Sequence, residues 1–422
     1  MAAGTVKTRR TFLVIFLFFS LLFSSSGQSS FTRQLIVQLN PGWSAPAPPG
    51  GDLLHIRAVG DNDTLHFLFC SQGAPTLLLV HTNSSSSSVK VDWTPFLARN
   101  TTGSLRVEPE SSVLSSTALV FSRVGDVHLK SAQTLNPHTQ EVNLSLSLSQ
   151  LLEYDDINDT ASMTSDLFPP YELQNLSWSR MNSSDPFAPL CGSVVNSSGS
   201  ICLQLSAFES EGRGQSWPRL LHTANSSQLG VWLDGVSPRA ARSRFMLELQ
   251  AVGGAYPLSR VDVHRSIDDE FTPSIFKASH WVSSANGSSE VVGFVRWRSV
   301  AFRRSKPALE DATPCRNSAP RPQSSEAAAS GLIRAFYSNV ETFGLNVSFG
   351  LAGEPFYNST RFLSWTLLMG VGSPPVDSFS ALVVAVMAVG LGAPVLVLLV
   401  GGVWICARKR AMEPTAAYEP IN

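Results

Sequence analysis

The 422-residue chain carries 31 Lys and Arg against 32 Asp and Glu, a formal net charge of −1. This balance gives no reason to expect a nucleic acid as a partner. Only 15% of the residues are charged, which is low for a soluble surface, and attached glycans can supply the missing solubility.

The chain begins with a short apolar segment. Lys7, Arg9 and Arg10 precede Phe12–Phe23, and small residues follow up to Gly27. A basic start, a short apolar run and small residues are typical of a signal peptide, so we predict one over residues 1–27. The alternative, an N-terminal anchor, is less favoured because a dozen helical residues span only about 18 Å of a hydrocarbon core about 30 Å thick.

The next 350 or so residues, 28–378, show the pattern of short strands. In Val142–Ser149 and Leu345–Phe349 apolar and polar residues alternate, which sends one set into a core and turns Asn143 and Asn346 toward solvent. Further half-buried strands are expected at Leu35–Leu39, Leu54–Ala58, Leu65–Phe69, Val89–Trp93, Ile201–Ala207, Leu229–Leu233, Phe245–Leu249 and Val291–Phe302. Many short strands between turn residues predict a mainly β, antiparallel sandwich-type ectodomain.

Asn-x-Ser/Thr sequons fill this same region. The twelve are Asn62, Asn83, Asn100, Asn143, Asn158, Asn175, Asn182, Asn196, Asn225, Asn286, Asn346 and Asn358. Because all of them lie between the two apolar segments, they predict a heavily N-glycosylated lumenal surface.

Two stretches of the ectodomain read as irregular. Pro41–Gly51 is rich in Pro and Gly, and Arg303–Gly331 is predicted to be a long surface loop or exposed linker. The ectodomain is long enough for two sandwich subdomains, and residues 182–199 are the best candidate boundary between them.

Four cysteines lie in the predicted oxidising compartment: Cys70, Cys191, Cys202 and Cys315. Three pairings are possible. Cys191 and Cys202 bracket a short Gly/Ser-rich loop, which favours a local hairpin bridge and would leave Cys70 to pair with Cys315.

Catalytic and metal-binding motifs are missing from the sequence, so we expect neither an enzyme nor a cofactor or metal. The best candidate for chemistry is His264–Glu270, where His264 could act with Asp268 or Glu270 as an acid/base pair. A solvated acidic turn is the favoured interpretation, because runs of carboxylates are usually surface charge.

A second apolar segment, Ala381–Ile405, carries no charge and is long enough to cross a membrane, so residues 379–407 are predicted to be a transmembrane helix. Arg408–Arg410 follow it, which places residues 408–422 in the cytosol and the ectodomain in the lumen. Ala388, Gly390 and Gly392 could let a partner helix approach closely. In the tail, Tyr418 and Ile421 form a Tyr-x-x-apolar pattern of the kind that clathrin adaptors bind as an extended strand, which predicts sorting to lysosomes.

Several blocks of the chain resemble the glycosylated lysosomal membrane protein family. They are Leu53–Gly60, Ala118–Phe121, Leu220–Ala224, His264–Glu270, Leu363–Trp365, Gly370–Gly372 and Pro374–Asp377. The resemblance runs from near Leu35 to Asn422. It implies a non-enzymatic, single-pass type I protein of the lysosomal membrane. It also implies an accessory subunit that protects a dipeptide-exporting transporter of the major-facilitator class from lumenal proteases.

Two alternatives stay open at this point. One is a membrane-tethered lysosomal hydrolase that uses His264 with Asp268 or Glu270, and the other is a glycan-bearing receptor or adhesion protein. The sequence also leaves a homodimer open.

Overall fold

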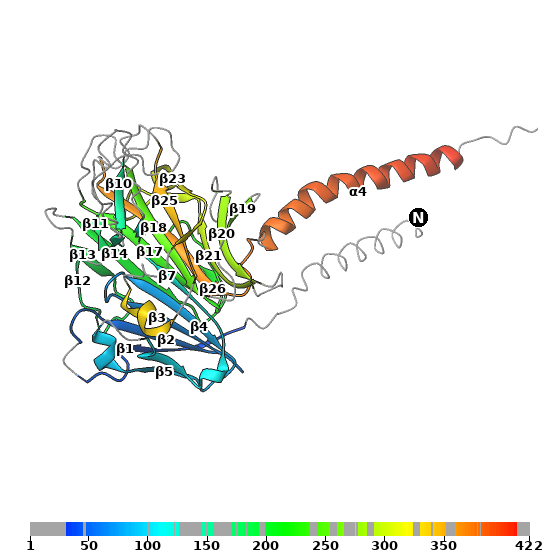
Figure 1. Ribbon diagram of the computed structural model, residues 1–422. Coiled ribbons are helices and arrows are strands. Elements are labelled where there is room, and N and C mark those ends of the chain that lie inside the picture. The colour runs from blue at the N-terminus through cyan, green and yellow to red at the C-terminus, as the bar shows by residue number, and fades with distance from the viewer. Residues whose placement is uncertain are drawn as a thin grey trace, which may run out of the picture.

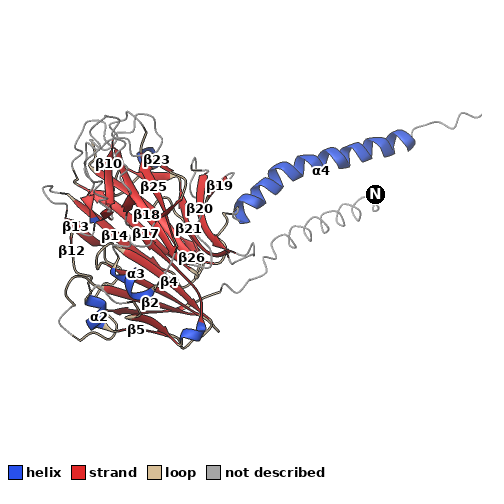
Figure 2. Ribbon diagram, in the orientation of Figure 1, coloured by secondary structure: helices blue, strands red, loops and turns tan. Residues whose placement is uncertain are grey.

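The computed structural model describes residues 31–44, 48–98, 102–121, 123–125, 146–148, 150–154, 171–173, 176–182, 184–193, 199–236, 244–253, 260–265, 275, 277–284, 291–323, 330–338, 341–351, 359–377, 379 and 381–411. Strands dominate these residues, as Figure 2 shows, and every strand pairing is antiparallel. The prediction of a mainly antiparallel β ectodomain with one C-terminal membrane-length helix is therefore confirmed.

The strands form two layers. The first layer contains β1 (Gln34–Leu39), β2 (Leu53–Val59), β3 (Thr64–Cys70), β4 (Thr76–Thr82), β7 (Val113–Val120), β10 (Gln150–Tyr154), β11 (Tyr171–Glu172), β18 (Arg244–Gly253), β23 (Ala312–Asn317), β24 (Arg321–Gln323) and β25 (Thr342–Phe349). The second contains β12 (Ser177–Trp178), β13 (Leu190–Ser193), β14 (Ser200–Ala207), β17 (Ser226–Asp234), β19 (Val261–Arg265), β20 (Lys277–Ser284), β21 (Val291–Arg298), β22 (Val300–Phe302) and β26 (Phe362–Val371).

Smaller elements complete the body. Three two-stranded ribbons are β5 (Ser88–Val91) with β6 (Leu105–Glu108), β8 (Arg123–Gly125) with β9 (Leu146–Leu148), and β15 (Gly212–Arg213) with β16 (Leu221–His222). The helices are α2 (Trp93–Leu97), α3 (Gly331–Phe336) and α4 (Ala381–Ala411), with 3-10 turns at η1 (Glu110–Ser112) and η3 (Leu309–Asp311). Figure 1 shows α4 extending away from the β-sheet body.

The main core lies between the two layers. Phe67 and Phe245 from the first layer share one buried cluster with Trp281, Trp297 and Trp365 from the second. Residues 294–298 of β21 illustrate the strand alternation. Val295 and Trp297 are buried in this core, and the alternate residues Phe294, Arg296 and Arg298 lie on the outer face of the second layer. The core cluster draws residues from both sides of 182–199, and a division into two subdomains stays a prediction.

The proposed irregular stretch Arg303–Gly331 is the prediction that the structure corrects most. Its middle forms β23, which pairs with β22 in the second layer and with β25 in the first, so it joins the two layers. The prediction failed because Pro314 and charged neighbours hide the strand pattern, while partners far away in the sequence supply its hydrogen bonds.

The cysteine pairing was half right. Cys191 and Cys202 face each other in the β13–β14 register and form a disulfide. Cys70 and Cys315 are both buried as free thiols, in different core clusters, so the proposed bridge between them is wrong. Burial raises the pKa of the Cys70 thiol to about 12, which keeps it protonated.

We expect the double variant Cys191→Ala, Cys202→Ala to lower the free energy of unfolding by about 2–3 kcal/mol. The reason is that the bridge closes a loop between two residues that are 11 positions apart, which restricts the unfolded chain. Denaturant unfolding of the purified chain measures this loss. Cys406→Ala is the control, since Cys406 is an exposed free thiol on α4. An equal change in the two variants would contradict the expectation.

Candidate functional site

The outer face of the second layer carries an unusual row of polar and charged side chains. Strand register places Asp262 of β19 beside His280 of β20, and His280 beside Arg296 of β21. Arg298 lies two residues further along β21, on the same face. Arg296 and Arg298 are each 1% exposed, so two guanidinium groups are buried where a sheet surface would ordinarily meet water.

These arginines converge on one carboxylate. Asp377 Oδ2 lies 2.6 Å from Arg296 Nη2 and 2.6 Å from Arg298 Nη2, and Arg213 Nη2 lies 3.4 Å from Asp377 Oδ1. Asp377 comes from the segment that connects β26 to α4, four residues before Ala381. The pairs therefore fasten the start of the membrane-length helix to the outer face of the sheet.

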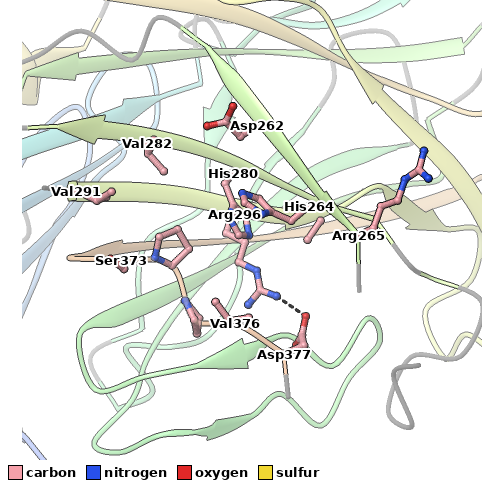
Figure 3. A pocket seen from close by; sticks show the side chains of 13 residues that line it. Asp262, His264, Arg265, His280, Val282, Val291, Arg296, Ser373, Val376 and Asp377 are labelled. Carbon is pink, nitrogen blue, oxygen red and sulfur yellow. Dashed lines mark hydrogen bonds and ion pairs between the residues drawn. The ribbon is translucent and has the colours of Figure 1, made fainter. Parts of the chain in front are cut away.

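A cavity of about 340 Å³ lies at this junction. Figure 3 shows its lining, with the strands β19, β20 and β21 on one side and residues 373–377 on the other. His264 and His280 stack with ring centroids 4.2 Å apart. His264 is exposed at the rim, while Arg296 is buried at the floor.

Burial in the cavity favours the neutral form of His280 and disfavours the charged form of Arg296. Burial, and then the nearby charges of Arg296, His264 and Arg298, together lower the pKa of His280 to about 3. Burial also lowers the pKa of Arg296 from its ordinary value, an effect that Asp377 partly offsets. Three buried nitrogens here have no hydrogen-bond partner in the described part of the chain: Arg296 Nε, Arg296 Nη1 and His280 Nε2.

The predicted acid/base pair is only partly placed. The structure puts His264 on the exposed edge strand β19, against the cavity. Asp268 and Glu270 lie outside the described residues, so a pairing with His264 stays a prediction. Among the described residues, no group of three or more His, Cys, Asp or Glu is arranged to hold a metal ion.

Five of the twelve sequon asparagines fall in the described ranges. Asn62, Asn83 and Asn182 are exposed, whereas Asn225 and Asn346 are half-buried. The Asn225 side chain accepts a hydrogen bond from Arg33 Nε at 2.9 Å, and Asn346 alternates with the core residues Leu345 and Val347 as predicted. The others, Asn100, Asn143, Asn158, Asn175, Asn196, Asn286 and Asn358, lie outside the description, as do Tyr418 and Ile421.

Sequence reasoning missed the arginine cluster. Arg296 and Arg298 occur in Val295–Arg298, where a charge at every second position breaks an otherwise apolar strand, and that alternation was the available signal. Asp377, 79 residues beyond Arg298, had no local signal beyond its place just before the membrane helix.

Comparison with known proteins gives a consistent result. A family model described as glycosylated lysosomal membrane protein matches residues 52–142 and 127–412. A glycosylated lysosomal membrane protein of Danio rerio is 50% identical over 408 residues, covering 93% of each chain. Glycosylated lysosomal membrane protein B of Xenopus laevis is 35% identical over 95% of this chain and 96% of its own length. The Homo sapiens relative is 35% identical over 93% and 91%.

Proposed function

The chain belongs to the glycosylated lysosomal membrane protein family, and from that premise we propose that it is a non-enzymatic accessory subunit of a lysosomal transporter. In this proposal the partner is a major-facilitator transporter that exports dipeptides, which the glycosylated β ectodomain shields from lumenal proteases. In the same proposal the ectodomain faces the lumen, because Arg408–Arg410 lie in the last turn of α4, after its apolar stretch.

The observation that carries the proposal is the uncovered state of α4. The helix has a stretch, Leu382–Arg410, that is long and apolar enough to cross a membrane, and none of its most apolar window is buried by the rest of the chain. Its whole perimeter is therefore available to lipid or to another membrane helix. Exposed sequons at Asn62, Asn83 and Asn182 would add bulky glycans around the ectodomain.

One face of α4 is suited to close helix packing. Ala381, Ala385, Ala388 and Gly392 follow each other at spacings of four, three and four residues, so they line one face. A side chain added at Gly392 would meet no atom of this chain within 4 Å. Small residues at this spacing let two membrane helices approach closely.

We expect removal of the protein to lower the steady-state abundance and half-life of its transporter partner. Within the chain, the pair Ala388→Leu, Gly392→Leu should abolish co-purification in mild detergent, because bulk on this face prevents close approach. The matched control is Val397→Leu, Gly401→Leu, which has the same spacing on the opposite side of the helix. An unchanged transporter half-life in the knockout would refute the proposal.

The tail offers a separate test of the lysosomal address. Tyr418→Ala is expected to move the protein to the plasma membrane, because an adaptor that binds an extended Tyr-x-x-apolar strand needs a pocket filled by the tyrosine. Surface biotinylation measures the shift, with Tyr357→Ala in the ectodomain as the control. Unchanged lysosomal delivery of Tyr418→Ala would mean that the tail carries no such signal.

A further inference from the structure

The cavity at the base of α4 contains polar nitrogens that no described residue of the chain satisfies. Arg296 is 1% exposed, and only its Nη2 bonds Asp377, so the N–H groups of Nε and Nη1 have no acceptor in the described part of the chain. His280 Nε2, beside it in the sheet register, is buried and also without a partner. Leaving a buried polar group unpaired is unfavourable, and more so when the group is charged.

The acids that line this cavity are already engaged. Asp377 is shared among Arg213, Arg296 and Arg298. Asp262 is paired with the exposed Arg260, whose Nε lies 3.1 Å from Asp262 Oδ1. The N–H groups of Arg296 that have no acceptor in the described part of the chain belong to a buried cation, and an anion is the ligand that forms the strongest hydrogen bonds with such groups.

The cavity also lies close to the membrane surface. Asp377 lies four positions before Ala381, a reach of at most about 14 Å to the first residue of α4. Val376 and Phe379 beside it are 78% and 40% exposed, which fits an apolar rim at a lipid interface. About 340 Å³ is more space than a bare inorganic ion needs, so part of a larger molecule can enter with the anionic group.

We propose that this cavity is a phosphate-binding site formed by Arg296 and His280, and that its position favours the phosphodiester of a membrane lipid headgroup. A free phosphate or soluble phosphoester carries the same group and is the other source. Phosphate suits the site better than a carboxylate in an acidic compartment, since a carboxylate begins to protonate near pH 4 whereas a phosphodiester stays ionised. The three unbonded N–H groups of Arg296 match an acceptor with several oxygens.

The test uses the full-length chain purified in phosphate-free dodecyl maltoside. Monomeric dihexanoyl phosphatidylglycerol is titrated in one arm and inorganic phosphate in the other, with sodium chloride of matched ionic strength as the blank. Isothermal titration calorimetry gives the dissociation constant, and the thermal midpoint reports whether each variant is folded. Neither readout involves the transporter, so the result is independent of the accessory-subunit proposal.

Saturable 1:1 binding is expected, weakened about tenfold by Arg296→Lys, which keeps a charge for Asp377 but loses the planar set of donors. His280→Phe should weaken it about fivefold through the loss of one hydrogen bond. Arg321→Gln, an exposed arginine on β24, is the matched control and should leave binding unchanged.

The two arms separate the sources of phosphate. Binding of the lipid alone assigns the site to a headgroup, whereas equal binding of inorganic phosphate assigns it to a soluble ligand. Absence of saturable binding in both arms, or the same affinity in His280→Phe and Arg321→Gln, would overturn the proposal. His280→Phe decides the matter even if Arg296→Lys does not fold.

Discussion

Asp377→Ala is expected to lower the free energy of unfolding by about 3–5 kcal/mol, the largest loss that we predict for a polar side chain in this protein. The side chains of Arg296 and Arg298 are 2% and 1% exposed, and each donates to Asp377 Oδ2 at 2.6 Å. Removing the carboxylate leaves Arg296 buried without the partner that compensates its charge.

Thermal and denaturant unfolding of the full-length chain measure this effect. Asp377→Asn keeps the shape without the charge and should fall between the wild type and Asp377→Ala. The matched control is Asp262→Asn in the same cavity, where the partner Arg260 is 78% exposed, so the change should stay within about 1 kcal/mol. Equal destabilisation by Asp262→Asn and Asp377→Ala would show that burial does not determine how much these ion pairs contribute to stability.

Loss of Asp377 should also loosen the segment that connects β26 to α4. Its ion pairs hold the connection between β26 and α4 against the sheet. Without them, the segment 372–377 would have fewer contacts with the ectodomain, and limited proteolysis should cut there sooner than in the wild type.

Lowering the pH from 7 to 5 is expected to reduce the free energy of unfolding by several kcal/mol, because buried histidines must stay neutral in the folded state: the neighbouring pair His55 and His66, and His280 in the cavity. Burial, and then the charge of Arg57, lower the pKa of His55 to about 4. Burial lowers the pKa of His66 to about 3, with smaller effects from His55 and Arg57. His55 Nε2 and His66 Nδ1 are 2.9 Å apart, and His66 Nε2 lies 2.9 Å from Ser87 Oγ.

The direction of this pH dependence follows from the difference in proton binding between the unfolded and the folded chain. An unfolded histidine titrates near pH 6.5, so between 6.5 and the lowered folded pKa the unfolded chain binds protons that the folded chain does not. Their stabilising contribution is complete above about pH 6.5. It falls by about 1.4 kcal/mol per pH unit for each histidine as the pH drops toward 4.

Denaturant unfolding at several pH values between 7 and 5 measures the slope of the free energy of unfolding against pH. His66→Gln removes one titrating group and should reduce the slope by about one proton per molecule. Leu114→Gln, at an exposed side chain that does not titrate, is the control and should leave the slope unchanged. Identical slopes in the two variants would contradict the assignment of the acid sensitivity to the buried pair.

Local pattern was enough to predict several features correctly. The alternation at Leu345–Phe349 put Leu345 and Val347 in the core, since a strand sends successive side chains to opposite faces whatever its partners are. The bridge between Cys191 and Cys202 could also be predicted, because the two cysteines are only eleven positions apart across a Gly/Ser-rich stretch of sequence. Segment 312–317 could not be predicted as a strand from local pattern, because its pairing with β22 and β25 is what makes it one.

The sequence by itself therefore determined the class of fold: a mainly β body that carries sequons, followed by one helix of membrane length. These features depend on periodicity, run length and short motifs, which act over a few residues. Tertiary structure alone decided that Arg296, Arg298 and Asp377 meet, since 79 and 81 residues separate the partners. It also decided that Cys70 and Cys315 remain apart and that the donors of Arg296 and His280 share one cavity. Contacts over such separations follow from strand order and layer packing, and no local pattern encodes them.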